Sequence, residues 1–230
     1  MIEILSPAEV EKGKATGALV ASILRAMRSR SQIGTNLLDI DGWTAQLIEE
    51  AGAVSCYVDY APSFGRGPFG HYICTSVNDA VLHGLPHDYV LSDGDLLTLD
   101  LAMIETTRRA LAAGIEAARP DARVGDISAA VGGVLKGAGF RVNAEFGGHG
   151  VGTTMHQDPH IANDGRAGRG YRLRPGLLLA IEPWIMADTD ALVTDDDGWT
   201  LRSATGARTA HSEHTIAITE GGAQILTLRP

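Results

Sequence analysis

Apolar side chains recur at helical spacing in four stretches of the chain. The first begins at Ser6-Pro7-Ala8-Glu9, which supplies the capping hydroxyl, first-turn proline and reciprocal glutamate of a helix start. Its apolar positions are Leu19, Val20, Ile23, Leu24 and Met27. The other three predicted helices span 35–51, 104–119 and 124–137, and glycines follow the second and fourth.

Apolar runs without helical spacing predict strands through the rest of the chain. They fall at 53–60, 71–77, 140–145, 177–186, 191–194, 199–203, 209–218 and 224–228, and another run ends at Asp100. A helix pair followed by strands appears once in each half, which hints at an internal duplication. The pattern predicts an α+β fold in which helices cover a curved antiparallel sheet.

Composition and charge narrow the class of protein. At 230 residues without a linker-like tract, the chain predicts a single domain over 1–230. A net charge of -9 argues against nucleic acid or an anionic membrane as partner. The acidic N-terminus does not resemble a signal peptide, so we expect a cytoplasmic protein whose two cysteines stay reduced.

Three acidic residues interrupt apolar strand patterns, and a glycine-framed histidine accompanies them. Asp100, Glu182 and Glu213 break the strands, and His149 lies among glycines at 147, 148, 150 and 152, which predict tight turns. A carboxylate in a buried strand is costly unless it is paired or binds a cation. The four residues together therefore predict a metal site, whereas 145–160 alone is typical of a glycine loop with solvated histidines.

Six segments in this order resemble the methionine aminopeptidases of the short bacterial type. They are CTSVNDAVLHGLP, DGDLLTLDLA, FGGHGVGTTMHQDPH, LAIEPW, DGWTLR and SEHTIAIT, spread over nearly the whole chain. The resemblance implies the pita-bread fold (creatinase/aminopeptidase-like), with two pseudo-twofold halves around a metal site. It also implies hydrolytic removal of the initiator methionine from nascent polypeptides.

The resemblance also implies roles for individual residues. The implied metal ligands are Asp100, His149, Glu182 and Glu213. His83 and His156 correspond to the histidines that contact the substrate, and Glu182 to the residue that relays a proton. Four residues fall where the family lines its methionine pocket: Cys56, Cys74, Met155 and Trp199. Sulfur and aromatic groups pack favourably against a thioether, which suits this assignment.

The implied cofactor is a pair of divalent metal ions. Two such ions lie about 3.5–4 Å apart in sites of this kind, and a water between them becomes a nucleophile near neutral pH. Mixed oxygen and nitrogen ligands suit Mn, Fe, Co or Zn and do not identify the ion. The implied partner is the N-terminus of a peptide or nascent chain at the ribosome, bound by a monomer.

The chain departs from the family pattern directly after Asp100. The family has a second metal-bridging Asp about ten residues further on, whereas here the predicted helix follows at once and about 25 residues are missing. Glu105 is the nearest carboxylate, but its odd offset from Asp100 would point it away in a strand. Either the protein lacks this segment or the printed sequence omits it; an intact mass near 24.2 kDa would exclude omission.

The missing Asp keeps two alternatives open. One is a catalytically impaired pita-bread protein that binds peptide N-termini or a protein partner. The other is an Xaa-Pro peptidase, which the cysteine-lined pocket and the lack of an extra N-terminal domain disfavour.

Overall fold

The computed structural model describes residues 2–62, 65–97, 101–143 and 145–228, and it opens with two helices. In α1 (Pro7–Arg30), Ser6 caps the helix and the Glu9 carboxylate accepts a hydrogen bond from the Ser6 amide at 2.7 Å. Asn36 caps α2 (Leu37–Glu50). Both predicted helices are confirmed; of the helically spaced apolar residues of α1, Ile23 and Met27 are buried, whereas Val20 and Leu24 are 41% and 39% exposed.

The second helix pair is α3 (Leu101–Ala117) and α4 (Val124–Gly137), which confirms the other two predicted helices. Their apolar faces share the largest core with the sheet, through residues such as Leu111, Ile127 and Leu135. Gly139 ends α4 in the left-handed region at φ +87, as the Gly-rich boundary predicts.

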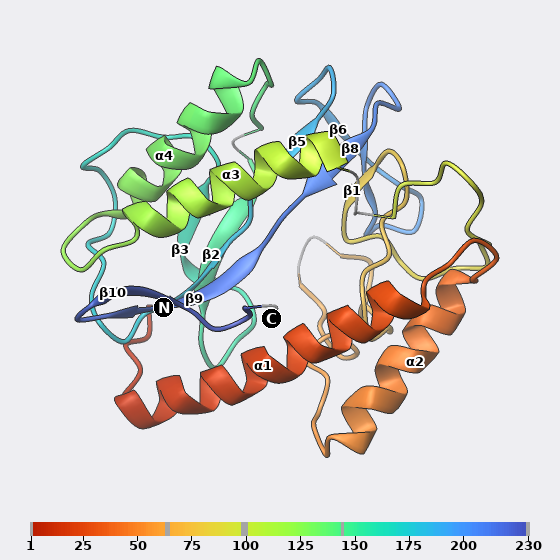
Figure 1. The fold of residues 1–230 in the computed structure, drawn as a ribbon, viewed down its shortest axis with the longest axis horizontal. Coiled ribbons are helices and arrows are strands. Elements are labelled where there is room, and N and C mark those ends of the chain that lie inside the picture. Colours follow the sequence, from red (N-terminus) through yellow and green to blue (C-terminus); the bar gives the residue numbers. More distant parts are fainter. Residues whose placement is uncertain (1, 63–64, 98–100, 144, 229–230) are drawn as a thin grey trace.

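One sheet of five antiparallel strands lies at the centre of the fold (Figure 1). Its strand order is β10-β9-β4-β2-β3. The strands are β2 (Gly147–Val151), β3 (Gln157–Ala162), β4 (Leu178–Ile181), β9 (His214–Thr219) and β10 (Gly222–Ile225). Helices α3 and α4 lie across one side of this sheet in Figure 1, and the N-terminal part of α1 contacts Leu178 of β4 and Ala217 of β9 through Val10. The α+β pita-bread fold with its two helix pairs is thereby confirmed.

Two smaller sheets complete the described strands. Strands β1 (Ala80–Leu82), β7 (Leu201–Ser203) and β6 (Leu192–Thr194) form one of them. Strand β5 (Trp184–Met186) pairs with β8 (Thr209–His211) in the other. Two residues, 182–183, connect β4 to β5, and two residues, 212–213, connect β8 to β9. Because β4 pairs with β9 and β5 pairs with β8, these two connections lie side by side between the sheets.

The strands predicted at 53–60, 71–77 and 140–145 are wrong. The first two segments are turns and irregular chain, in which Phe69 donates its amide to Tyr60 and Gly70 donates to Val58. Val54 is 94% exposed, so the apolar run there reflects no buried strand. The described part of 140–145 is also irregular, because Asn143 accepts the amides of Glu145 and Phe146.

The tight turns predicted around His149 are also wrong, because residues 147–151 form strand β2 of the central sheet. As for the helices, none in the described ranges combines the length and hydrophobicity that crossing a membrane requires.

Candidate metal centre

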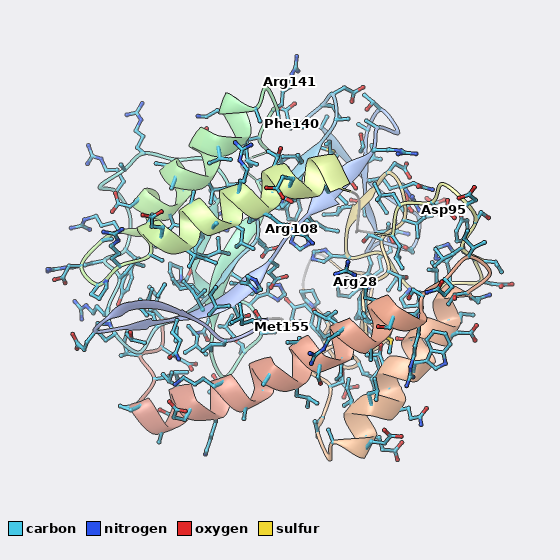
Figure 2. All side chains as sticks on the ribbon, viewed as in Figure 1. Arg28, Asp95, Arg108, Phe140, Arg141 and Met155 are labelled. Carbon is cyan, nitrogen blue, oxygen red and sulfur yellow. The ribbon has the colours of Figure 1, made fainter. Side chains whose placement is uncertain are left out.

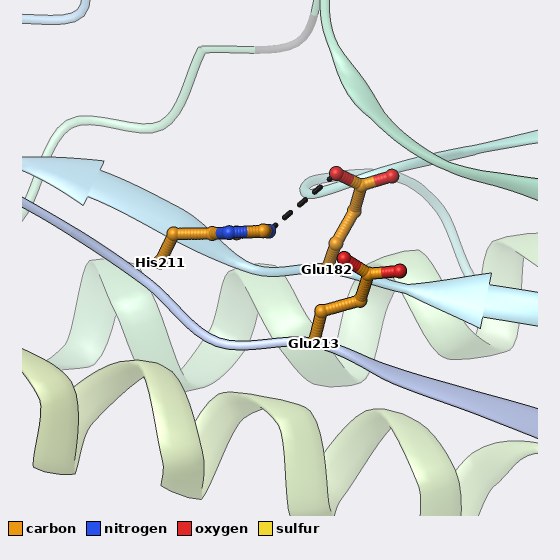
Figure 3. A group of neighbouring side chains, drawn as sticks. All are labelled: Glu182, His211 and Glu213. Atoms are coloured by element: carbon orange, nitrogen blue, oxygen red, sulfur yellow. Dashed lines mark ion pairs between the residues drawn. The ribbon is translucent and has the colours of Figure 1, made fainter. Parts of the chain in front are cut away.

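The carboxylate of Glu182 lies between two imidazoles at the junction of the sheets. His149 Nε2 is 3.6 Å from Glu182 Oε1, and His211 Nε2 is 3.5 Å from Glu182 Oε2. Glu213 approaches the same carboxylate from the neighbouring strand connection (Figure 3). Glu182, His211 and Glu213 each offer one donor atom, and these three atoms lie within 4.8 Å of one another.

Glycines in β2 hold His149 at this junction. A Cβ on Gly148 would lie 2.2 Å from the carbonyl oxygen of Ala180, and one on Gly150 would lie 2.1 Å from that of Asp158. Only glycine allows β2 to sit this close to both neighbouring strands. The pattern of 147–152 therefore encodes close backbone approach in extended chain, which places His149 opposite Ala180 of β4, two residues before Glu182.

The backbone also fixes the orientation of the His149 ring. Its Nδ1 lies 2.9 Å from the carbonyl oxygen of Gly150, an acceptor, so Nδ1 carries the proton. In the neutral ring Nε2 then presents a lone pair toward Glu182. Two acceptors that face each other at 3.6 Å require a proton or a cation between them, and this arrangement is typical of metal-binding histidines.

The two histidines with predicted substrate roles lie beside this centre. The His156 ring is 4.0 Å from the His149 ring, centroid to centroid, and stacks on Tyr60 at 5.3 Å. His83 meets Trp199 edge-on at 6.5 Å. Burial lowers the pKa of both His83 and His156, so both are neutral near pH 7. A groove of about 510 Å³ opens beside His149 and His156.

Sulfur and aromatic groups gather next to these histidines. Cys56 donates to the Met155 sulfur at 3.8 Å, and Met155 lies on the connection between β2 and β3 (Figure 2). Phe69, which is buried, meets the buried Trp199 edge-on at 5.2 Å. Aromatic contacts further link Tyr57 to Phe69 and Tyr60 to Trp199.

The acidic cluster affects the titration of its neighbours. Burial first, and then the charges of Glu213 and Glu182, raise the pKa of Cys74 to about 12. Burial is also the largest cause that raises the pKa of the Tyr57 hydroxyl, and the charges of Glu213 and Glu182 raise it further. Burial lowers the pKa of His211, but Glu182 and Glu213 outweigh it and the net pKa is raised. Cys74 and Tyr57 therefore face the negative potential of the cluster as neutral groups.

The structure brings together most, though not all, of the residues that the sequence singled out. Glu182 lies beside both His149 and Glu213, while Asp100 lies outside the described residues. Glu105 is exposed on α3 and is not part of the donor group formed by Glu182, His211 and Glu213. The sequence analysis missed His211, Tyr60 and Phe69. His211 had one available signal, its position two residues before Glu213.

The described residues fit a divalent metal ion. One imidazole nitrogen and two carboxylates form a donor set that suits transition metals. His211 Nε2 is buried and, among the described residues, has no hydrogen-bond partner, as expected for a ligand atom without its ion.

The sequence model of metallopeptidase family M24 matches residues 11–105 and 101–220, so the chain belongs to this family of metal-dependent peptidases.

Within that family, the chain is similar to methionine aminopeptidases over its full length. It is 36% identical to methionine aminopeptidase A of Synechocystis sp. over 253 residues, which covers 99% of this chain and 98% of that protein. It superposes on the crystal structure of a methionine aminopeptidase from Thermotoga maritima with a TM-score of 0.90 and 34% identity, covering 99% of both chains. The chain shares only its fold with the prolidase from Pyrococcus furiosus. The two are 18% identical with a TM-score of 0.72, and the match covers 65% of the prolidase chain.

The comparisons also locate a missing segment. The alignment with the Synechocystis protein spans 253 positions. It includes 99% of the 230 residues of this chain, which is about 228, so about 25 positions of the alignment have no residue of this chain. The two segments matched by the family model meet at 101–105, directly after Asp100 and at the start of α3. The shortening expected from the sequence is therefore consistent with a gap directly after Asp100.

Proposed function

We propose that this chain is a metal-dependent aminopeptidase that hydrolyses the first peptide bond of polypeptides beginning with methionine. The observation that carries the proposal is that Glu182 lies beside both His149 and Glu213 in a fold shared over full length with methionine aminopeptidases. The comparisons do not favour the Xaa-Pro peptidase or the binding protein without activity.

Glu182, Glu213 and His149 would hold the divalent ion or ions, with Co, Mn, Fe or Zn as candidates. When bound, such an ion acidifies a water molecule and polarises the scissile carbonyl. Glu182 is suited to accept the proton of the attacking water and to return it to the leaving amine, because its carboxylate faces both the ligand histidine and the cluster.

The two neutral histidines are suited to bind the peptide. His156 would donate a hydrogen bond to the scissile carbonyl oxygen, and His83 would hold the adjoining peptide nitrogen. Their lowered pKa values keep each ring able to accept at one nitrogen and donate at the other.

The pocket beside them suits a methionine side chain. Cys56, Cys74, Met155 and Trp199 supply soft and aromatic surface, and Phe69 supports Trp199. We further propose that a monomer acts on nascent chains at the ribosome in the cytoplasm, and that residues 1–230 form one catalytic domain.

The test compares three peptides with metal-loaded protein: Met-Ala-Ser, Leu-Ala-Ser and the dipeptide Ala-Pro. We expect methionine release from the first alone, and loss of that release in Glu213→Ala with the circular dichroism of the fold retained. Cleavage of Ala-Pro would support the Xaa-Pro peptidase instead. Metal binding without cleavage of any peptide would refute the proposal in favour of a binding protein.

A further inference from the structure

His211 belongs to no expected ligand set, yet it lies inside the acidic cluster. Its Nε2 is 3.5 Å from Glu182 Oε2, and one oxygen of Glu213 completes a group of three donor atoms within 4.8 Å (Figure 3). Two donors on a tetrahedral ion, each about 2.1 Å from it, are roughly 3.4 Å apart. The observed separation of His211 and Glu182 therefore already fits a shared ion.

Without an ion, His211 Nε2 faces Glu182 in an ion pair of 3.5 Å, which is long for a hydrogen bond. The buried Nε2 has no hydrogen-bond partner among the described residues. An unsatisfied buried polar atom costs about 1–3 kcal/mol, so natural proteins rarely keep one without a reason. A cation between Nε2 and the two carboxylates would contact all three groups together.

The framework around His211 fixes its position. In the β5–β8 pair His211 lies opposite Trp184, and the Ser212 amide donates to the Pro183 carbonyl at 3.1 Å. The hydroxyls of Ser212 and Thr107 are 2.7 Å apart, which ties the segment between His211 and Glu213 to α3. The helix that follows the shortened connection thus supports the segment that carries both donors.

His211 and His149 occupy different sides of Glu182. His149 contacts Oε1 of Glu182 and His211 contacts Oε2, so the two imidazoles lie at different oxygens of the carboxylate. Relative to the Synechocystis protein, the chain also lacks about 25 positions.

We propose that His211 is a metal ligand of this chain and, with Glu182 and Glu213, binds one divalent ion. The inference rests on the proposed metallopeptidase function and deepens it, because it specifies how this chain holds its metal. An imidazole among the ligands favours Zn, Co or Fe over Mg or Ca.

The test measures metal binding without any peptide. Intact mass first confirms the 24.2 kDa chain. Metal-stripped wild type, His211→Gln and His87→Gln are then titrated with Co²⁺, following the visible absorption of the bound ion and its affinity by chelator competition. His87 is the matched control because it is exposed, lies outside the donor group, and donates from Nδ1 to the nearby Leu85 carbonyl at 2.8 Å.

We expect His211→Gln to weaken Co²⁺ binding by at least about 100-fold, since loss of a supporting residue alone costs 10–100-fold, and to change the absorption spectrum. His87→Gln should match the wild type. Wild-type affinity and spectrum in His211→Gln would overturn the inference.

A second measurement does not depend on the variant folding. In wild-type crystals soaked with Zn²⁺, an anomalous peak about 2.0–2.1 Å from His211 Nε2 supports ligation, and a peak bound by His149 and the glutamates without His211 overturns it. Neither readout involves turnover. Failure to release methionine therefore counts against the proposed function, whereas metal bound without His211 counts against this inference.

Discussion

Substitution of Gly148 by alanine tests how the sheet positions the metal centre. The added Cβ would lie 2.2 Å from the Ala180 carbonyl oxygen, whereas a carbon rests at least about 3.3 Å from such an oxygen. Strands β2 and β4 must therefore separate by about 1 Å. Since His149 follows Gly148 and Glu182 follows Ala180 by two residues, the 3.6 Å contact between them should widen by a similar amount.

A misplacement of this size costs about 100-fold in rate, or about 2.7 kcal/mol in the activation barrier. Overpacking should also destabilise the fold by about 1–3 kcal/mol. Gly133→Ala is the control, because Gly133 lies in α4 with no atom within 4 Å of the added Cβ, and the change should stabilise the helix by up to about 1 kcal/mol.

The assay combines kcat/KM for methionine release from Met-Ala-Ser with denaturant unfolding of each variant. We expect Gly148→Ala to lose rate and stability while Gly133→Ala loses neither. Unchanged kcat/KM in a folded Gly148→Ala protein would refute the argument that close strand approach positions His149.

Three further predictions follow from other parts of the structure. Glu182→Gln should lower kcat by about 10²–10⁴-fold, because it removes the proton-accepting group at nearly constant side-chain shape. Glu50→Gln, at an exposed position, is the control. Equal rates in the two variants would contradict the role assigned to Glu182. Iodoacetamide at pH 8 should modify the exposed Cys56 before Cys74, whose pKa of about 12 leaves little thiolate. Peptide mapping that finds Cys74 labelled first would be inconsistent with this raised pKa. Ile127→Ala in the main core should cost about 2–5 kcal/mol in unfolding free energy, and a cost below 1 kcal/mol would show that the α3–α4 core is wrongly described.

The helices were predictable because their signals are local. The Ser6–Glu9 capping box and the glycines after α2 and α4 determine helix ends within a few residues of sequence. The strands were less predictable. The run at 53–60 has strand-like composition but folds through local turns, whereas the glycines of β2 look like a turn until neighbouring strands approach within contact distance.

The candidate site shows the same division between local and distant information. The resemblance to a family singled out His149, Glu182 and Glu213, and the structure places Glu182 beside each of the other two. His211 could not be assigned from its segment alone, because its role depends on pairing between β5 and β8 and on the packing of Thr107 against Ser212. Both contacts join residues far apart in the chain.

The most direct test of the account is the rate of methionine release as metal is returned to stripped protein. We predict no release without metal, a rate that rises in proportion to bound Mn²⁺ or Co²⁺, and a plateau once the site formed by Glu182, His211 and Glu213 is filled. Full activity in metal-free protein, or no activity in protein shown to hold its ion, would contradict the claim that this cluster hydrolyses peptides through a bound cation.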